Sequence, residues 1–132
     1  MGLVRRAATL KALARKVVDI SGVPNTIEAM LELPGVGRYA AGATLAVAFE
    51  RAAPVVDGVT ARVYRRYFGL SSEVAASADP ELWGLVDLAT PKKVVREWNW
   101  AVLDLAATVC LPKIPRCGEC PLVSDCAWSR AR

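Results

Sequence analysis

Four cysteines near the C-terminus place the strongest constraint on what this chain can fold into. They are the only cysteines among 132 residues, and the chain has no His to complete a mixed ligand set. Their spacing is C-x6-C-x2-C-x5-C, from Cys110 through Cys117 and Cys120 to Cys126. Four sulfurs packed so closely in sequence can hold one metal centre.

The spacing alone leaves the kind of centre open. Structural zinc sites usually contain two close pairs of cysteines, and only Cys117 and Cys120 form such a pair. On general grounds zinc leads, an iron–sulfur cluster follows, and disulfides come last. Residues 1–10 carry Arg5 and Arg6 with no apolar stretch behind them, so we expect no signal peptide. A cytoplasmic protein, nucleoid-associated if prokaryotic, would keep its cysteines as thiolates.

Composition indicates a folded domain and excludes some chemistry. Hydrophobic residues make up 54% of the chain and the mean hydropathy is +0.29, so disorder is not expected. A net charge of +4 permits an anionic partner without requiring one. The absence of His excludes Ser-His and Cys-His catalysis. The longest apolar run, residues 39–49, is too short to cross a bilayer, so no membrane partner is expected.

Hydrophobic periodicity predicts an all-α protein. Helices are expected over residues 3–20, through residue 33, over 38–50, after residue 57, over 80–88 and over 91–109, with a connector at 52–56 and a loop at 71–79. The apolar face of the first helix is predicted to comprise Leu3, Ala7, Leu10, Ala14, Val17 and Val18. Asn25 and Glu28 fit a capping box for the second helix. In the helix after residue 57, Val59, Val63, Tyr64 and Tyr67 are spaced for burial.

A tight turn joins the second and third predicted helices. Its sequence, residues 33–37, is Leu-Pro-Gly-Val-Gly, and Gly35 and Gly37 around Val36 allow positive φ angles. Such a turn exposes backbone N–H groups beside the helix that starts at Arg38. These groups suit a phosphate oxygen, bound directly or through a monovalent cation, and would give sequence-independent DNA binding. An ordinary helix–helix turn is the alternative interpretation.

Asp57 lies between the apolar residues 54–56 and the helix that begins at Gly58. A plain N-cap is the common role of Asp at such a place. The alternative is a partly buried carboxylate at a helix start, which can stabilise a cation or position a water molecule.

The turn at residues 33–39, the Val56-Asp57-Gly58 segment and the four cysteines follow one another in an informative order. In that order and at these separations they resemble the helix-hairpin-helix DNA glycosylases with an iron–sulfur cluster, the endonuclease III and adenine glycosylase superfamily. The resemblance covers residues 2–128. It implies a partial helical barrel with a helix-hairpin-helix motif and a C-terminal [4Fe–4S] cluster loop. Residues 1–90 would form the barrel part, with the motif at about 27–50, and residues 91–132 the last long helix and the cluster segment.

The resemblance assigns roles to individual residues. The four cysteines become cluster ligands, and Lys113 and Arg116 in the loop between the first two would face the backbone of double-stranded DNA. The target nucleotide is flipped out of the duplex, and Asp57 stabilises the positive charge that builds on its sugar as the base leaves. Lyase-type relatives carry Lys where this chain has Tyr39, so base release without strand cleavage is expected. Packing beside the turn is the alternative role of Tyr39.

The substrate and the activity of this chain stay open. Asp57-Gly58 and residues 99–105 look more like the adenine glycosylase branch, which favours adenine opposite G or 8-oxoG, while thymine in T·G is the second choice. Family members have several helices before residue 3, so the resemblance implies a truncated N-terminus. An uncovered apolar face would then favour self-association. A non-catalytic or fragmentary DNA-binding relative and a zinc-stabilised helical interaction domain are the alternative functions.

Overall fold

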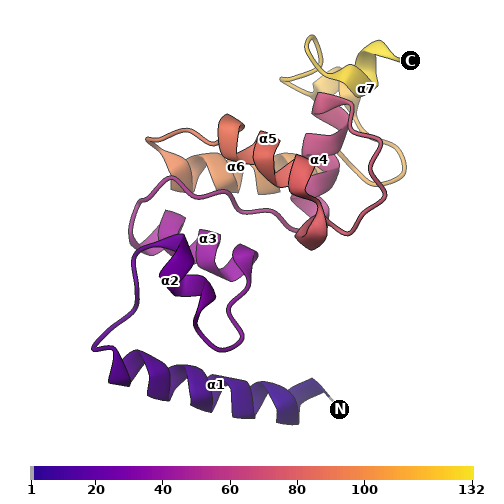
Figure 1. The fold of residues 1–132 in the computed structure, drawn as a ribbon. Coiled ribbons are helices and arrows are strands. Elements are labelled where there is room, and N and C mark those ends of the chain that lie inside the picture. Colours follow the sequence, from indigo (N-terminus) through magenta and orange to yellow (C-terminus); the bar gives the residue numbers. More distant parts are fainter. Residues whose placement is uncertain (1) are drawn as a thin grey trace.

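The computed structural model describes residues 2–132, without the side chains of residues 2, 3 and 5. In this part of the chain all regular secondary structure is helical (Figure 1). The elements are α1 (Gly2–Asp19), α2 (Ile27–Leu31), α3 (Arg38–Ala48), α4 (Gly58–Phe68), η1 (Ala76–Ala78), α5 (Pro80–Ala89), α6 (Val95–Thr108), η2 (Cys117–Glu119) and α7 (Ala127–Arg130). The predicted all-α class is therefore confirmed. Figure 1 shows α1 at one end of the molecule and the cysteine segment with α7 at the other.

Two predicted helix starts are wrong. The side chain of Thr26, and not that of Asn25, caps α2 by accepting a hydrogen bond from Ala29 N at 3.4 Å, so Glu28 lies one position too early for a capping box. Helix α6 begins at Val95 rather than residue 91, because Val94 adopts the left-handed conformation with a φ of 53°. A left-handed residue interrupts a right-handed helix.

Two clusters of buried side chains form the core. The first lies between α2 and α3 and contains Met30, Leu33, Ala41, Leu45 and Ala53. The second lies around α4 and α5 and contains Val56, Ala61, Tyr64, Leu82, Trp83 and Val86. The connector between α3 and α4 supplies Ala53 to one cluster and Val56 to the other. It therefore runs from one core to the next and delivers Asp57 at the junction.

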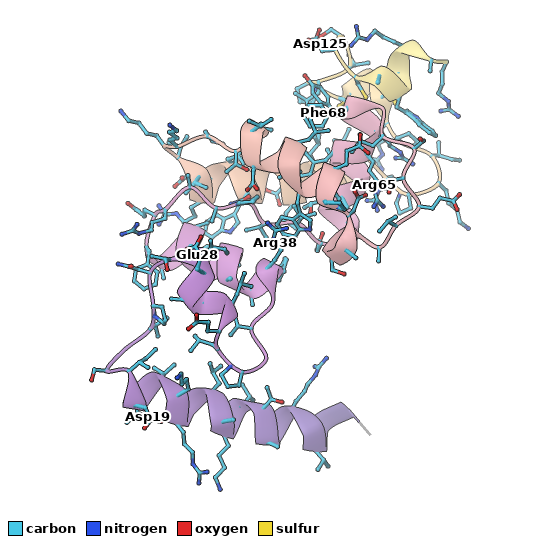
Figure 2. All side chains as sticks on the ribbon, in the orientation of Figure 1. Asp19, Glu28, Arg38, Arg65, Phe68 and Asp125 are labelled. Atoms are coloured by element: carbon cyan, nitrogen blue, oxygen red, sulfur yellow. The ribbon has the colours of Figure 1, made fainter. Side chains whose placement is uncertain are left out.

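Helix α1 is only lightly attached to this core. Leu13 and Val17 pack against the cluster of α2 and α3. The predicted apolar face is wrong in part, because Leu10 and Val18 are 63% and 76% exposed; the side chain of Leu3 lies outside the described residues. Figure 2 shows many side chains of α1 projecting away from the rest of the molecule. Within the part of the chain described, no helix is long and apolar enough to cross a membrane.

The C-terminal half of α4 is tied to the start of α5. Of the four residues predicted to be buried on this helix, Val63 and Tyr64 are buried and Val59 is exposed. Arg65 forms an ion pair with Asp79 at 2.7 Å, and the Asp79 carboxylate also accepts the Leu82 N–H at the start of α5. The hydrogen bond from Arg65 lowers the pKa of Asp79. This ion pair ties α4 to α5 across the segment 71–79, which contains the short helix η1 instead of being all loop.

Candidate functional site at the hairpin turn, the helix start and the cysteine segment

The turn between α2 and α3 leaves a helix start open to the outside. Gly35 has a φ of 76°, so it occupies the left-handed region that favours glycine. Gly37 has a φ of −98° and is extended, so the expectation of a positive φ at this second glycine is wrong. Gly37 is the N-cap of α3, and no side chain caps this helix. The first N–H groups of α3 are therefore available to an anion.

Gly35 also marks a close approach between the turn and α1. A Cβ atom at this position would lie 2.3 Å from Cγ2 of Thr9. The left-handed φ angle is what favours glycine here, because the Thr9 side chain could rotate away from a Cβ. The turn is supported by α1 on one side and by the cluster of α2 and α3 on the other.

The two side chains that follow the turn differ in their surroundings. The guanidinium of Arg38 lies 4.5 Å from the ring centroid of Trp83, so it already makes a cation–π contact within the protein (Figure 2). Tyr39 is 46% exposed. In the described part of the chain, no hydrogen bond or ion pair joins Tyr39 to Asp57, which lies on another element.

The carboxylate of Asp57 is held by one of its two oxygens. Oδ1 accepts hydrogen bonds from Val59 N at 2.8 Å, from Thr60 N at 2.7 Å and from Thr60 Oγ1 at 3.0 Å. The Thr60 hydroxyl in turn accepts the Asp57 N–H at 2.9 Å, which completes a capping box. Oδ2 accepts no hydrogen bond from the described residues. The carboxylate is half-buried and orientated, and it keeps one free oxygen for a positive charge or a water molecule.

Both interpretations of Asp57 are therefore compatible with the structure. The residue is an N-cap, and the cap uses only Oδ1. An N-cap needs only one carboxylate oxygen, so the free Oδ2 agrees with a plain cap and also leaves room for the second role.

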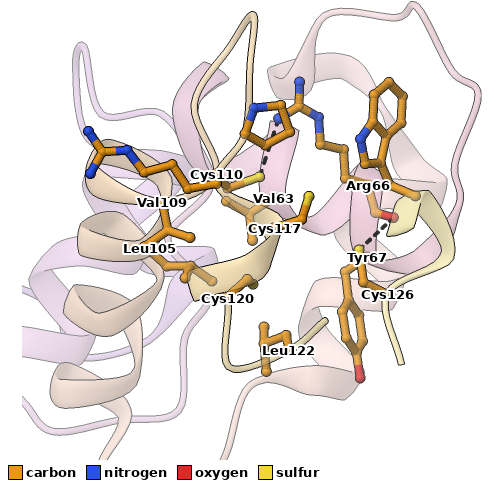
Figure 3. Close-up of a pocket in the computed structure, with 13 residues that line it drawn as sticks. Val63, Arg66, Tyr67, Leu105, Val109, Cys110, Cys117, Cys120, Leu122 and Cys126 are labelled. Carbon is orange, nitrogen blue, oxygen red and sulfur yellow. Dashed lines mark hydrogen bonds between the residues drawn. The ribbon is translucent and has the colours of Figure 1, made fainter. Parts of the chain in front are cut away.

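The four cysteines line a single cavity between α4, the end of α6 and the C-terminal segment (Figure 3). All four are half-buried free thiols. The remaining lining is mostly apolar, with Val63, Leu105, Val109 and Leu122 among its members. A ligand at this place would therefore be shielded from water by aliphatic side chains.

The sulfurs surround this cavity without meeting at one point. Among the residues that the structure describes, no three Cys, Asp or Glu side chains lie close enough together to hold one metal ion. Zinc needs four sulfurs at about 2.3 Å from a single centre. A [4Fe–4S] cluster takes one thiolate at each iron, so four cysteines around one cavity could supply its complete ligand set.

Two arginines of α4 hold the cysteine segment, and sequence reasoning missed both. Arg62 donates to the carbonyls of Ala106 at 2.8 Å and Cys110 at 2.9 Å, at the end of α6. Arg66 donates to the carbonyls of Leu111 and Pro112, each at 2.7 Å, and to Sγ of Cys110 at 3.4 Å. The available signal was two arginines four residues apart on a helix with no acidic residue to pair with them.

The predicted DNA-facing cations of the cysteine loop are both exposed. Lys113 has no ion-pair partner among the described residues. Arg116 lies 3.9 Å from Glu119, and both side chains are more than half exposed, so this pair is weak.

Known proteins resemble the chain over nearly its whole length. It is 37% identical over 126 residues to the thymine/uracil-DNA glycosylase of Methanothermobacter thermautotrophicus. The aligned residues make up 94% of this chain and 57% of that protein. It is 39% identical over 130 residues to the adenine DNA glycosylase of Homo sapiens, and the aligned residues make up 96% of this chain and 24% of that protein. The chain belongs to the helix-hairpin-helix DNA glycosylases. No protein-family model matches it.

Solved structures agree with this assignment. The structure of a thermostable thymine-DNA glycosylase superposes with a TM-score of 0.89 at 37% identity, over 99% of this chain and 62% of that one. A trapped endonuclease III–DNA covalent intermediate gives a TM-score of 0.78 at 27% identity. The resemblance inferred from three motifs is thus confirmed as a family. The chain spans little more than half the length of the first of these glycosylases and about a quarter of the human one.

Proposed function

We propose that this protein hydrolyses the N-glycosidic bond of a mispaired base in double-stranded DNA. The observation that carries the proposal is the carboxylate of Asp57, which has Oδ1 fully hydrogen-bonded and Oδ2 free. An orientated carboxylate with a free oxygen stabilises the oxocarbenium-like charge that forms when a sugar loses its substituent. The glycosylases named above make this chemistry the first choice.

In the proposed reaction each group has one task. The open start of α3 and the backbone N–H groups of Gly35, Gly37 and Arg38 grip a phosphate, with or without a monovalent cation between them, while the Val36 N–H already donates to Leu33 O. The nucleotide to be cleaved leaves the base stack. As the bond between C1′ and the base breaks, Asp57 Oδ2 faces the positive sugar and orients a water molecule, whose oxygen becomes bonded to C1′. The base leaves with the bonding electrons and takes up a proton, and an abasic site remains.

Strand cleavage is not part of this reaction. A lyase step needs an amine that can form an imine with C1′, and the phenol of Tyr39 cannot form one. Tyr39 is 46% exposed next to the turn, a position from which it can contact a flipped nucleotide. We assign it to the substrate pocket.

Two bases are candidates for removal, one for each kind of related glycosylase. Adenine opposite G or 8-oxoG is favoured by Asp57-Gly58 and by residues 99–105, and adenine glycosylases are among the matching proteins. Thymine in T·G is the second candidate, supported by the similarity to the thymine-DNA glycosylase structure. A base-release assay on A·8-oxoG, A·G and T·G duplexes distinguishes them.

The proposed role of the Asp57 carboxylate is tested by Asp57→Asn. An amide keeps the cap, because its oxygen still accepts the Val59 and Thr60 N–H groups, but it carries no negative charge. We expect single-turnover base release to fall at least about a hundredfold while DNA affinity is retained. Release at the wild-type rate would remove Asp57 from this role. DNA binding without base release by the wild type would favour a non-catalytic DNA-binding relative.

We further propose that Cys110, Cys117, Cys120 and Cys126 hold a [4Fe–4S] cluster. Such a cluster would join the C-terminal segment to α4 and α6 and shape the loop that carries Lys113 and Arg116, in a structural role without a part in the hydrolysis. The four thiols that line one mostly apolar cavity support it. Iron and acid-labile sulfide in equal amounts, about four of each per chain, are expected in anaerobically purified protein. Stoichiometric zinc without sulfide would instead support a zinc-stabilised domain.

The proposed activity also predicts where the protein works. A DNA glycosylase acts where the chromosome lies, which in a prokaryote is the nucleoid within the cytoplasm, and we propose that location.

A further inference from the structure

A buried amide of α6 lies beside the connector that carries the proposed catalytic acid. The side chain of Asn99 accepts a hydrogen bond from Val55 N at 3.2 Å through Oδ1 and donates one to Ala53 O at 3.1 Å through Nδ2. Asn99 is only 3% exposed, and it lies 44 residues from Val55 and 46 from Ala53 in sequence. The amide therefore pairs with the connector as a neighbouring strand would, although the connector has no strand partner in the described chain.

The connector depends on this pairing because it is buried and irregular. Ala53, Val55 and Val56 are 4%, 5% and 3% exposed, and residues 51–57 belong to no helix. Buried backbone groups outside regular structure need a partner, since an unpaired one costs about 1–3 kcal/mol. Asn99 satisfies the N–H of Val55 and the C=O of Ala53 with one side chain.

The pairing ends two residues before Asp57. From Val55 the chain continues through the buried Val56 directly to the cap of α4, and the Thr60 hydroxyl also lies 3.4 Å from Val55 O. A displacement of Val55 must therefore move Asp57 or break its contacts with Thr60. On the opposite side of the connector, Gly42 of α3 approaches Pro54 so closely that the backbone cannot move toward α3.

We infer that Asn99 is a positioning residue that holds the connector so that Oδ2 of Asp57 faces the sugar of the bound nucleotide. The inference rests on the proposed function for its catalytic consequence and on the hydrogen bonds alone for its structural one. Asn99 touches neither the substrate nor Asp57, and it acts through Val55 and Ala53.

Two substitutions test this role. Asn99→Leu keeps the size of the side chain and removes both hydrogen bonds. Asn99→Asp keeps the shape, but its carboxylate cannot donate to Ala53 O; its protonated form can donate and accept like the amide. The control is Thr90→Val, which removes a buried hydrogen bond to Val86 O at the end of α5 but none to the connector.

The first measurement is single-turnover base release, from whichever mismatched duplex the wild type processes, beside affinity for the same duplex. Asn99→Leu should slow release about tenfold to a hundredfold, because displacement of a catalytic group by about 1 Å has an effect of this size. Affinity should stay within about twofold, since the turn between α2 and α3 is untouched. Asn99→Asp should be slow at neutral pH and recover relative to the wild type as the pH falls and its carboxyl group takes up a proton. Thr90→Val should release the base at the wild-type rate.

The second measurement is backbone amide hydrogen exchange, which does not require activity. In Asn99→Leu the amide of Val55 should exchange faster, and so should those of Val59 and Thr60, which report the cap made by Asp57. Wild-type exchange at these three amides in Asn99→Leu would overturn the inference. So would an equal loss of release rate in Thr90→Val, or the absence of recovery in Asn99→Asp at low pH. If the wild type releases no base, the proposed function fails, and hydrogen exchange still decides the role of Asn99.

Discussion

The turn proposed to bind phosphate and the carboxylate proposed to act in catalysis are built in opposite ways. At the turn between α2 and α3 the backbone provides the binding groups, and its special features are the left-handed Gly35 and the uncapped start of α3. At Asp57 a side chain provides the chemistry, and it is held by Thr60 within its own helix and by contacts to the connector from α3 and α6. The binding groups of the turn come from its own five residues, although α1 packs against it. The position of Asp57 depends on hydrogen bonds from a segment more than 40 residues away.

This difference suits the two tasks. A phosphate is gripped at every position along DNA, so a site that reads only backbone charge needs no accurate register. A carboxylate that stabilises a transition state must be placed to well within 1 Å. The more demanding task is assigned to the element that lies between the two cores and is contacted from both sides.

Among the glycine and cation substitutions, the largest effect is expected at Gly42, which supports the connector that carries Asp57. A Cβ atom there would lie 2.2 Å from the carbonyl oxygen of Pro54, which is backbone and cannot rotate away. Gly42→Ala should push the connector from α3, destabilise the protein by about 1–3 kcal/mol and slow base release about tenfold or more. DNA affinity should change little, because the turn is not moved. Thermal unfolding, single-turnover kinetics and binding assays measure the three quantities.

Gly84 supplies the matched control for this prediction. It lies inside α5, and a Cβ atom there would have no neighbour within 4 Å. Gly84→Ala should therefore be neutral or stabilise by up to about 1 kcal/mol. Equal stability losses in the two variants would mean that the approach of Pro54 to α3 is not what fixes the connector.

A smaller effect is expected at the turn, where the two glycines should behave differently. Gly35→Ala would place a Cβ in the left-handed region and against Thr9, and should cost about 1–2 kcal/mol and weaken DNA binding. Gly37→Ala meets no neighbouring atom and suits an extended residue, so its cost should stay below about 1 kcal/mol, the loss at a helix N-cap. Hydrogen exchange at Val59 and Thr60 should be unchanged in both. Faster exchange there would show that the turn and the acid are not independent.

The same contrast explains what the sequence could predict. The turn, the cap at Asp57 and the cysteine spacing are local patterns, and their order was enough to indicate the family. Asn99 entered the prediction only within residues 99–105, which resemble the adenine glycosylase branch. Its hydrogen-bond partners lie more than 40 residues away in sequence, so no local pattern reveals them. Arg62 and Arg66 were missed for a similar reason, since nothing near them in sequence reveals carbonyl partners on the cysteine loop.

Some local conformations and exposed fractions also differ from the prediction. The positive φ of Val94 delays the start of α6, although residue 91 is a proline that favours an earlier start. Gly37 is extended because it caps α3, while Gly35 alone makes the turn. The exposure of Leu10 and Val18 could not be read from periodicity, which predicts an apolar face but not whether anything packs against it.

The smallest effect is expected from a cation of the cysteine loop, which extends the comparison to a third kind of contact. Lys113 is exposed and makes no ion pair within the described chain, so it can serve a phosphate without breaking any internal contact. If it contacts one phosphate, Lys113→Ala should weaken binding to all duplexes alike, whatever the mismatch, and reduce the slope of log affinity against log salt by about 0.9. Arg116→Ala is the comparison. The Glu119 carboxylate, 3.9 Å from the Arg116 guanidinium, offsets part of that positive charge, so the loss of Arg116 should weaken DNA binding less. Base release at saturating enzyme should be unaltered in both variants. A sequence-dependent loss, or an unchanged salt slope for Lys113→Ala, would show that this loop does not meet the DNA backbone and would leave the turn as the phosphate contact of the chain.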